Sequence, residues 1–285
     1  MTQWQRSTKI VYTPRGTRKY RRGSSRAVLI ALGAVIACVA LAYGVYRLLL
    51  WEKIFISSVE IGGIQKISES DIRSAVNAYL GETVLGFIPR KEYFFLSGSA
   101  LSAELRELFP EIRSLVIDKK FPDHLSINIE ERSPWGIVCG RTAPVDAESG
   151  NVPCAYVDTE GYAFDQAPVL IGSLTKKIFT DRNDIAIGSA AVSPNVIREY
   201  DELKALYEAM SLPLTHISLS VDSPRDMRVY SNEWYGITDI AIDIDRLKGV
   251  FEPLFRNELS GKIDRLEYVD LRFGNKIFYK LRGAQ

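Results

Sequence analysis

Residues 112–134 read IRSLVIDKKFPDHLSINIEERSP, and this stretch predicts two antiparallel strands joined by a tight turn. Apolar and polar residues alternate from Leu125 to Glu130, the period-two pattern of a strand with one buried face. Ile112 to Lys119 predicts the preceding strand, and Phe121-Pro122-Asp123 supplies the turn. A hairpin with one apolar face needs further elements to cover it, and the residues ahead of it supply them.

Two helices and a strand are predicted N-terminal to this hairpin. Ile54 to Ile61 has strand composition and ends at a Gly-Gly turn signal. Residues 68–81 begin with a capping-box-like serine and end with glycine, as a short amphipathic helix does. Leu101 to Leu108 predicts a second helix, and the aromatic residues 82–98 between the helices are interpreted as a loop or irregular insert. The predicted order is strand, helix, helix, strand, strand.

An apolar run lies further towards the N-terminus. Ala27 to Tyr46 holds twenty uncharged residues, and at ~1.5 Å rise per residue they span about 30 Å, the thickness of a bilayer core. Met1 to Arg26 carries eight Lys or Arg residues and no acidic residue. The positive-inside rule therefore predicts a cytoplasmic tail at 1–26, a membrane helix at 27–50 and a translocated remainder. The basic tail is expected to contact anionic lipid head groups.

Two other interpretations of this end of the chain remain open. A cleaved signal peptide would have an apolar region of roughly 7–15 residues, shorter than the run seen here. A nucleic-acid-binding arm is the second alternative. The chain from Trp51 onward argues against it, because 27 basic residues stand against 35 acidic ones there. No nucleic-acid partner is expected.

The cysteines indicate the compartment. Cys38 lies inside the apolar run, whereas Cys139 and Cys154 lie in the predicted outer part. An even pair in an oxidising compartment is a disulfide candidate, with two free thiols as the alternative. The chain has only two histidines, and no third or fourth ligand lies near the cysteines in sequence. Neither a metal site nor a cofactor is expected.

The second half of the chain predicts a strand-rich region with two helices. Its first hairpin is expected at 135–139 and 154–158, and its last at 266–273 and 276–281 through Gly274-Asn275. Between these hairpins the predicted helices are Pro194–Met210 and Leu247–Leu259, the latter interrupted by Pro253, and the predicted strands are 214–221, 227–230 and 237–242. The fold class is therefore α+β: one N-terminal transmembrane helix, a β-α-α-β-β unit and a β-rich region.

These motifs, in this order, resemble the single-span bacterial cell-division proteins of the FtsQ/DivIB family. The residues that carry the resemblance are Phe55, Val59-Glu60-Ile61, Gly63, Phe109-Pro110, Phe121-Pro122, Glu131-Arg132-Ser133-Pro134, Val157–Phe164 and Val269–Phe273. The resemblance implies a POTRA domain at 54–132, a β domain at 133–281 and a short tail at 282–285. The insert at 82–98 and the loop between Cys139 and Cys154 depart from the usual pattern.

The resemblance also implies a function and a site. The family's members are non-enzymatic scaffolds at the division septum. Their β domain binds FtsB- or DivIC-like and FtsL-like proteins and helps regulate the septal peptidoglycan synthase pair FtsW and FtsI. The binding mode is strand addition to an exposed sheet edge. The matching residues here are Lys276, Ile277, Phe278, Tyr279, Lys280 and Leu281, with Arg272 beside them. An ordinary closing strand with solvated lysines is the alternative.

Other classes of function have weaker support. The nearest catalytic candidates are Glu130-Glu131, the pair Asp243 and Asp245, and His216. Adjacent strand residues face opposite ways, so the two glutamates cannot flank one substrate, and Asp245 suits a helix N-cap. A POTRA-bearing translocation or assembly protein would carry repeated POTRA units or a barrel of alternating strands. A generic membrane-anchored binding protein is the remaining alternative.

Overall fold

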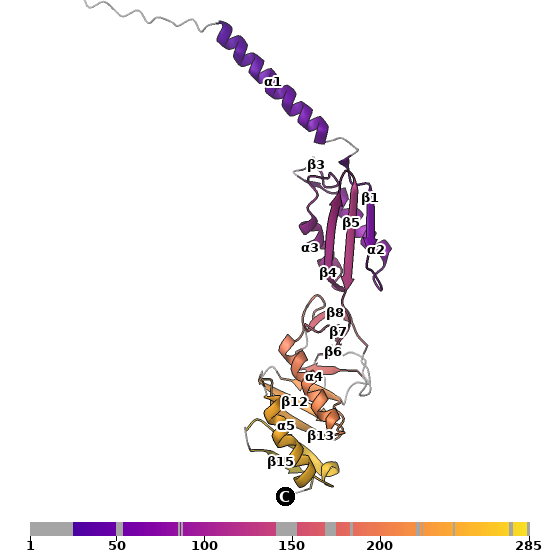
Figure 1. Ribbon diagram of the computed structural model, residues 1–285, viewed down its shortest axis with the longest axis vertical. Helices are drawn as coiled ribbons and strands as arrows, with labels where there is room; N and C mark the ends of the chain where they lie inside the picture. Colours follow the sequence, from indigo (N-terminus) through magenta and orange to yellow (C-terminus); the bar gives the residue numbers. More distant parts are fainter. Residues whose placement is uncertain are drawn as a thin grey trace, which may run out of the picture. The chain divides into compact units, whose positions relative to one another are not determined.

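The computed structural model in Figure 1 describes residues 25–49, 54–84, 86, 88–140, 153–168, 175–182, 185–220, 223, 225–241, 243–273 and 276–283. The chain separates into two compact units, Met1–Glu52 and Lys53–Gln285, and each is taken by itself below. Of the predicted cytoplasmic tail at 1–26, residues 1–24 lie outside the described residues. Residue 50 of the predicted membrane span and residues 284–285 of the predicted C-terminal tail also lie outside them.

The described part of the first unit is one helix, α1 (Ser25–Leu49). Within it, Arg26–Arg47 is long and apolar enough to cross a membrane. The side chains from Arg26 to Arg47 are exposed all round, whereas a helix of a water-soluble core would bury one face. Basic residues flank the apolar stretch at both ends, where long side chains can reach the head groups. The helix thus has the length and surface of a membrane span.

The second unit begins with a three-stranded sheet in the order β1-β5-β4. β1 (Ser58–Gly62) runs parallel to β5 (His124–Glu131), which pairs antiparallel with β4 (Ile112–Lys120). Helices α2 (Glu69–Gly81) and α3 (Gly98–Leu108) pack against the sheet (Figure 1). The predicted order of strand, helix, helix, strand, strand is confirmed.

The alternation in β5 explains this arrangement. Leu125, Ile127 and Ile129 are almost fully buried, and the residues between them face away from the core. Burying such side chains contributes roughly 1.5–3 kcal/mol each. The residues packed in this core are Ile56, Ile72, Val76, Tyr79, Leu80, Leu96, Leu101, Leu105, Ile112, Leu115, Leu125, Ile127 and Ile129.

The insert at 82–98 is more ordered than a loop. It contains a two-stranded ladder of β2 (Thr83–Val84) and β3 (Ile88–Pro89), and Phe55 forms an isolated bridge with Glu92. The prediction of an irregular insert was therefore incomplete. Such short pairs are hard to predict, because two residues show no period and the partner of Phe55 lies far along the chain.

Glu131 stabilises the connection between β1 and α2 through hydrogen bonds. Its carboxylate accepts the backbone N–H groups of Gln65 (2.6 Å), Lys66 (3.0 Å) and Ile67 (3.1 Å). Partial burial raises the pKa of Glu131, but these three N–H groups outweigh it and leave the pKa below its ordinary value. Gly63 starts the same connection with φ +83°, and a Cβ there would clash with the Ile129 carbonyl, so the turn requires glycine.

Glu131→Gln should lower the free energy of unfolding by about 1–2 kcal/mol at neutral pH. Because the pKa of Glu131 is lower in the folded than in the unfolded protein, its ionised carboxylate stabilises the fold above pH 4.5, and this stabilisation is lost as the pH falls. The difference in free energy of unfolding between wild type and variant should therefore begin to shrink below pH 4.5. Denaturant unfolding of the detergent-solubilised protein at several pH values measures this, with the exposed Glu130→Gln as control. A gap that stays constant down to low pH would contradict the assignment.

The rest of this unit is built on a ten-stranded sheet in the order β10-β8-β7-β6-β9-β11-β12-β13-β14-β15. Its strands are β6 (Gly136–Cys139), β7 (Cys154–Val157), β8 (Tyr162–Gln166), β9 (Lys177–Thr180), β10 (Ser189–Ala190), β11 (His216–Leu219), β12 (Asp226–Ser231), β13 (Trp234–Asp239), β14 (Leu266–Asp270) and β15 (Phe278–Leu281). Helices α4 (Pro194–Ala209) and α5 (Ile244–Pro253) contribute to one apolar core with this sheet. The strand-rich prediction with two helices is confirmed.

Some boundaries differ from the sequence prediction. β8, β9 and β10 were not predicted, and the strand expected at 237–242 is Trp234–Asp239. The turn before β13 runs through Asn232 with φ +44°, so the hairpin lacks the glycine that usually marks such a turn. Pro253 ends α5, and the next turn, Leu254–Glu258, is a π-helix. Proline cannot donate a backbone hydrogen bond, which explains the change of helix type there.

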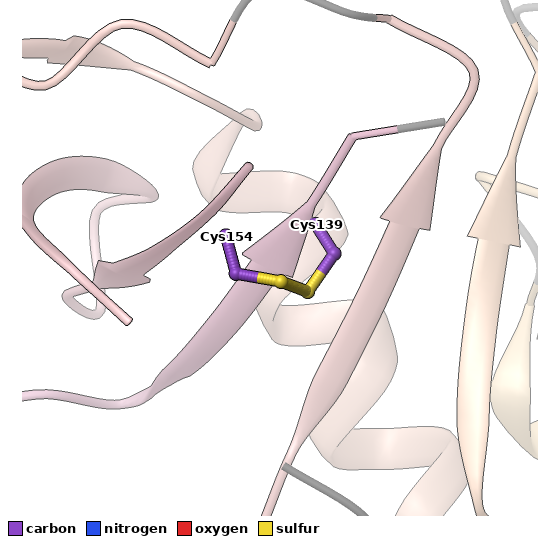
Figure 2. The surroundings of a disulfide bond; sticks show 2 residues. All are labelled: Cys139 and Cys154. Carbon is purple, nitrogen blue, oxygen red and sulfur yellow. A yellow bond between two sulfur atoms is a disulfide. The ribbon is translucent and has the colours of Figure 1, made fainter. Parts of the chain in front are cut away.

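A disulfide joins Cys139 of β6 to Cys154 of β7 (Figure 2). The two residues are direct partners in the antiparallel register, with Cα atoms 4.1 Å apart. Both side chains are buried beside Ile137. The bond therefore joins the two ends of the segment between these strands. Residues 141–152 of that segment lie outside the described range.

Alkylation before and after reduction should detect this bond. One alkyl group, on Cys38, is expected before reduction and three after it, by intact mass. Because a loop of about fifteen residues is closed, reduction should lower the free energy of unfolding by about 2–3 kcal/mol. Uptake of three groups by the unreduced protein would contradict the pairing.

Candidate partner-binding edge

β15 is the last strand of the ten-stranded sheet, and it pairs with β14 through the partners Val269–Tyr279 and Tyr268–Lys280. In the part of the chain that the structure describes, no strand pairs with its other side. Phe278 is 52% exposed and Tyr279 38% exposed, although both are large and apolar in body. An outer strand with exposed aromatic residues can accept a further strand.

Arg272 fixes the chain just after β14. Its guanidinium donates to both carboxylate oxygens of Asp270 (Nε–Oδ1 3.0 Å, Nη2–Oδ2 2.7 Å) and to Asp226 (Nη1–Oδ2 2.8 Å). Burial raises the pKa of the Asp270 carboxyl, but the bonds from Arg272 outweigh it and lower the pKa. The bond to Asp270 in turn raises the pKa of Arg272. Arg272 therefore acts first as a structural cation that joins β12 to the end of β14.

Lys280 is also engaged within the sheet. Its Nζ lies 2.9 Å from Glu267 Oε2, and the hydrogen bond between the two side chains raises the pKa of Lys280. The pair is exposed, so the bond is weak and can exchange for a partner carboxylate. The lysine still places a positive charge on the outer strand, which discourages unspecific edge pairing.

A groove adjoins this edge beside α5. It has a volume of about 220 Å³ and lies between α5 and the segment that leads into β15. Its lining residues are Asp239, Ala241, Asp243, Arg246, Leu247, Val250, Leu271, Arg272 and Ile277. Phe273 meets Phe278 edge-on, with ring centroids 5.2 Å apart, at the same end of the strand. Apolar and charged groups thus stand together next to the open edge.

The structure brings Phe278, Tyr279, Lys280 and Leu281 together in β15, but Lys276 and Ile277 precede the strand. The predicted strand at 276–281 was thus two residues too long. β14 ends at Asp270, because the backbone N–H of Arg272 bonds to the Asp270 side chain instead of to the chain before β15. Residue 276 therefore has no strand to pair with. The predicted turn at 274–275 lies outside the described residues.

The catalytic candidates have structural roles. Glu131 holds the β1–α2 connection and Glu130 accepts a hydrogen bond from Ser114 at 2.7 Å. Asp243, rather than Asp245, is the N-cap of α5. His216 is stacked on Tyr230, and its burial, with the nearby Lys177 charge, lowers its pKa to about 4. Among the described residues, no cluster of His, Cys, Asp and Glu could hold a metal ion.

A second feature joins the three-stranded sheet to the ten-stranded sheet. Arg132 donates to the Asp158 carboxylate and, through Nε, to the Pro110 carbonyl (3.2 Å), and its guanidinium lies 3.9 Å from the Tyr162 ring centroid. Asp158 also accepts the backbone N–H groups of Glu160 and Tyr162. The Glu-Arg-Ser-Pro motif marks this place in the sequence, but no local pattern identifies Asp158 as its partner.

Residues 55–132 match a family model described as "POTRA domain, FtsQ-type". The match covers the strand, helix, helix, strand, strand unit from Phe55 to Arg132. No curated protein matches the chain. The FtsQ-type POTRA family is a non-catalytic scaffold family linked to cell division. Such a domain, after the one apolar helix of membrane length found among the described residues, fits a single-pass membrane protein.

Proposed function

Since residues 55–132 are a POTRA domain of the FtsQ type and the chain is consistent with the FtsQ/DivIB family, we propose that it is a single-span scaffold of the bacterial division machinery. It binds other division membrane proteins outside the cytoplasm and helps control septal peptidoglycan synthesis. The single observation that carries this proposal is the FtsQ-type domain directly after a membrane-length helix.

The proposed topology divides the chain into five parts. Residues 1–26 stay in the cytoplasm at anionic lipid, and 27–50 span the membrane. A POTRA domain at 54–132, a β domain at 133–281 and a tail at 282–285 lie outside. The basic, acid-free N-terminus supports this orientation by the positive-inside rule. The Cys139–Cys154 disulfide supports an oxidising compartment for the β domain.

The proposed mechanism is strand addition at β15. A segment of an FtsB- or DivIC-like protein, with an FtsL-like protein beside it, hydrogen-bonds to the outer edge of Phe278–Leu281. Exposed Phe278 and Tyr279 pack against its side chains, and the charge of Lys280 favours an acidic segment. The assembled complex then acts on the FtsW/FtsI-type synthase pair. This exposed edge supports the partner assignment over an ordinary closing strand.

Localisation in dividing cells tests the function. A fluorescent protein fused at Met1 of the full chain is expected to accumulate at the division site. A fusion to residues 1–52 alone, which lacks the outer unit, is the matched control and should remain spread over the membrane. Uniform membrane fluorescence of the full chain would instead favour a POTRA-type binding or assembly protein outside the divisome.

A further inference from the structure

Three aromatic residues gather at one end of the three-stranded sheet: Tyr93 and Phe94 in the insert, and Phe121 in the β4–β5 turn. We call them the aromatic tip. Tyr93 contacts both others edge-on, with ring centroids 5.5 Å from Phe94 and 5.6 Å from Phe121. Phe94 is nevertheless 61% exposed and Phe121 67% exposed. Large apolar rings that remain exposed next to each other indicate an interaction surface.

Specific bonds hold the tip in this conformation. The buried Glu92 carboxylate accepts the backbone N–H groups of Phe94 and Phe95, each at 3.0 Å. Lys119 Nζ donates to the carbonyls of Tyr93 (3.0 Å) and Leu96 (2.9 Å). The Phe94 ring therefore projects from a loop whose backbone is bonded on both sides. The buried carboxylate and the ammonium group thus fix the backbone of this loop.

The tip lies beside the first described residues after the membrane helix. The backbone N–H of Tyr93 bonds to the Ile54 carbonyl (3.0 Å), and that of Ile56 bonds to the Lys91 carbonyl (2.8 Å). α1 ends at Leu49, so five peptide steps separate the helix from Ile54. Even fully extended, at ~3.3–3.6 Å per residue, they span at most roughly 18 Å. The tip is therefore tethered close to the surface from which α1 emerges.

The charges at this end suit a membrane surface. Lys91 and Lys120 are exposed next to the aromatic residues, and Lys91 Nζ lies 4.9 Å from the Phe55 ring centroid. Of the carboxylates at this end, Glu82 pairs with Arg90 at 3.0 Å and Asp123 accepts a hydrogen bond from Ser57. Aromatic rings with lysines beside them are the combination that partitions into the head-group region of anionic bilayers.

We propose that the aromatic tip inserts Phe94 and Phe121 into the phospholipid interface of the leaflet from which α1 emerges, with Lys91 and Lys120 on the lipid phosphates. This inference rests on the proposed membrane anchoring by α1. The contact adds a second membrane attachment to the domain at 54–132. It limits the tilt of that domain relative to the bilayer.

The test uses the full chain in nanodiscs that contain anionic phospholipid. Cys38→Ser removes the free thiol, and Phe94→Cys or Phe121→Cys then carries an environment-sensitive fluorophore. Leu108→Cys at the far end of α3, 56% exposed and also apolar, is the matched control. Lipids with a nitroxide just below the head groups should quench about half of the emission at positions 94 and 121, as expected for burial of about 5–10 Å, and little at 108.

The outcomes separate the two proposals. A chain that fails to remain with the nanodiscs would overturn the membrane anchoring itself. A chain that inserts but shows equal quenching at 94, 121 and 108 would overturn only the aromatic contact.

Discussion

Tyr279→Pro is expected to weaken capture of the proposed partner strand by roughly thirty- to hundred-fold, about 2–3 kcal/mol, without unfolding the sheet. The N–H of Arg282 bonds inward to the Arg265 carbonyl. Backbone groups alternate along an antiparallel strand, so the N–H of Lys280 also faces β14 and that of Tyr279 faces outward. Proline at an outward position removes a donor for the partner but none for β14.

The measurement is the affinity of the full chain for the FtsB- or DivIC-like protein of the same organism. The two proteins are co-expressed and co-purified. Tyr279→Thr is the matched control, because it loses the same aromatic ring and keeps the N–H. The difference between the two variants isolates the backbone contribution. If both variants bind like wild type while remaining folded, the partner does not add to β15.

Arg132→Met should lower the free energy of unfolding by about 3–5 kcal/mol. The side chains of Arg132 and Asp158 are only 12% and 5% exposed, and the variant would leave the Asp158 carboxylate buried without its cation. It would also remove the bond to the Pro110 carbonyl and the contact with the Tyr162 ring. Because Arg132 connects the two sheets, limited proteolysis should show cleavage between them becoming faster.

The neighbouring Arg113 provides the control for this prediction. Arg113 pairs with Glu160 at 3.3 Å, but their side chains are 47% and 58% exposed. Arg113→Met should therefore change the free energy of unfolding by less than about 1 kcal/mol. Denaturant unfolding of both variants measures the difference. An equal decrease in the free energy of unfolding for both variants would show that the buried pair stabilises the fold no more than the exposed one.

Sequence patterns predicted those elements whose apolar spacing repeats several times. The alternation from Leu125 to Glu130 predicted β5, and the apolar series after Ser68 predicted α2. Short strands gave no such signal. β10 has only two residues, and β9 has four, of which three are buried, so neither shows a repeated alternation. A buried polar residue such as Lys177 or Thr180 in β9 also breaks the expected alternation.

The candidate edge was predictable only in part. Local composition identified Phe278 to Leu281 as a strand, but β14 ends beside Arg272, whose guanidinium is held by Asp226, a residue far away in the sequence. The aromatic tip depends in the same way on Ile54 meeting residues 91–93 and on the β4–β5 turn lying beside them. Such pairings have no local signature.

By itself, the sequence determined the membrane-length helix, its basic flank and the strand, helix, helix, strand, strand order after it, because hydrophobic period and charge are properties of neighbouring residues. Only the tertiary structure decided which strand ends the sheet, which cation joins the two sheets and where exposed rings gather. These features depend on groups that are distant in the chain and meet only when the core packs, so the free energy of the whole fold selects them.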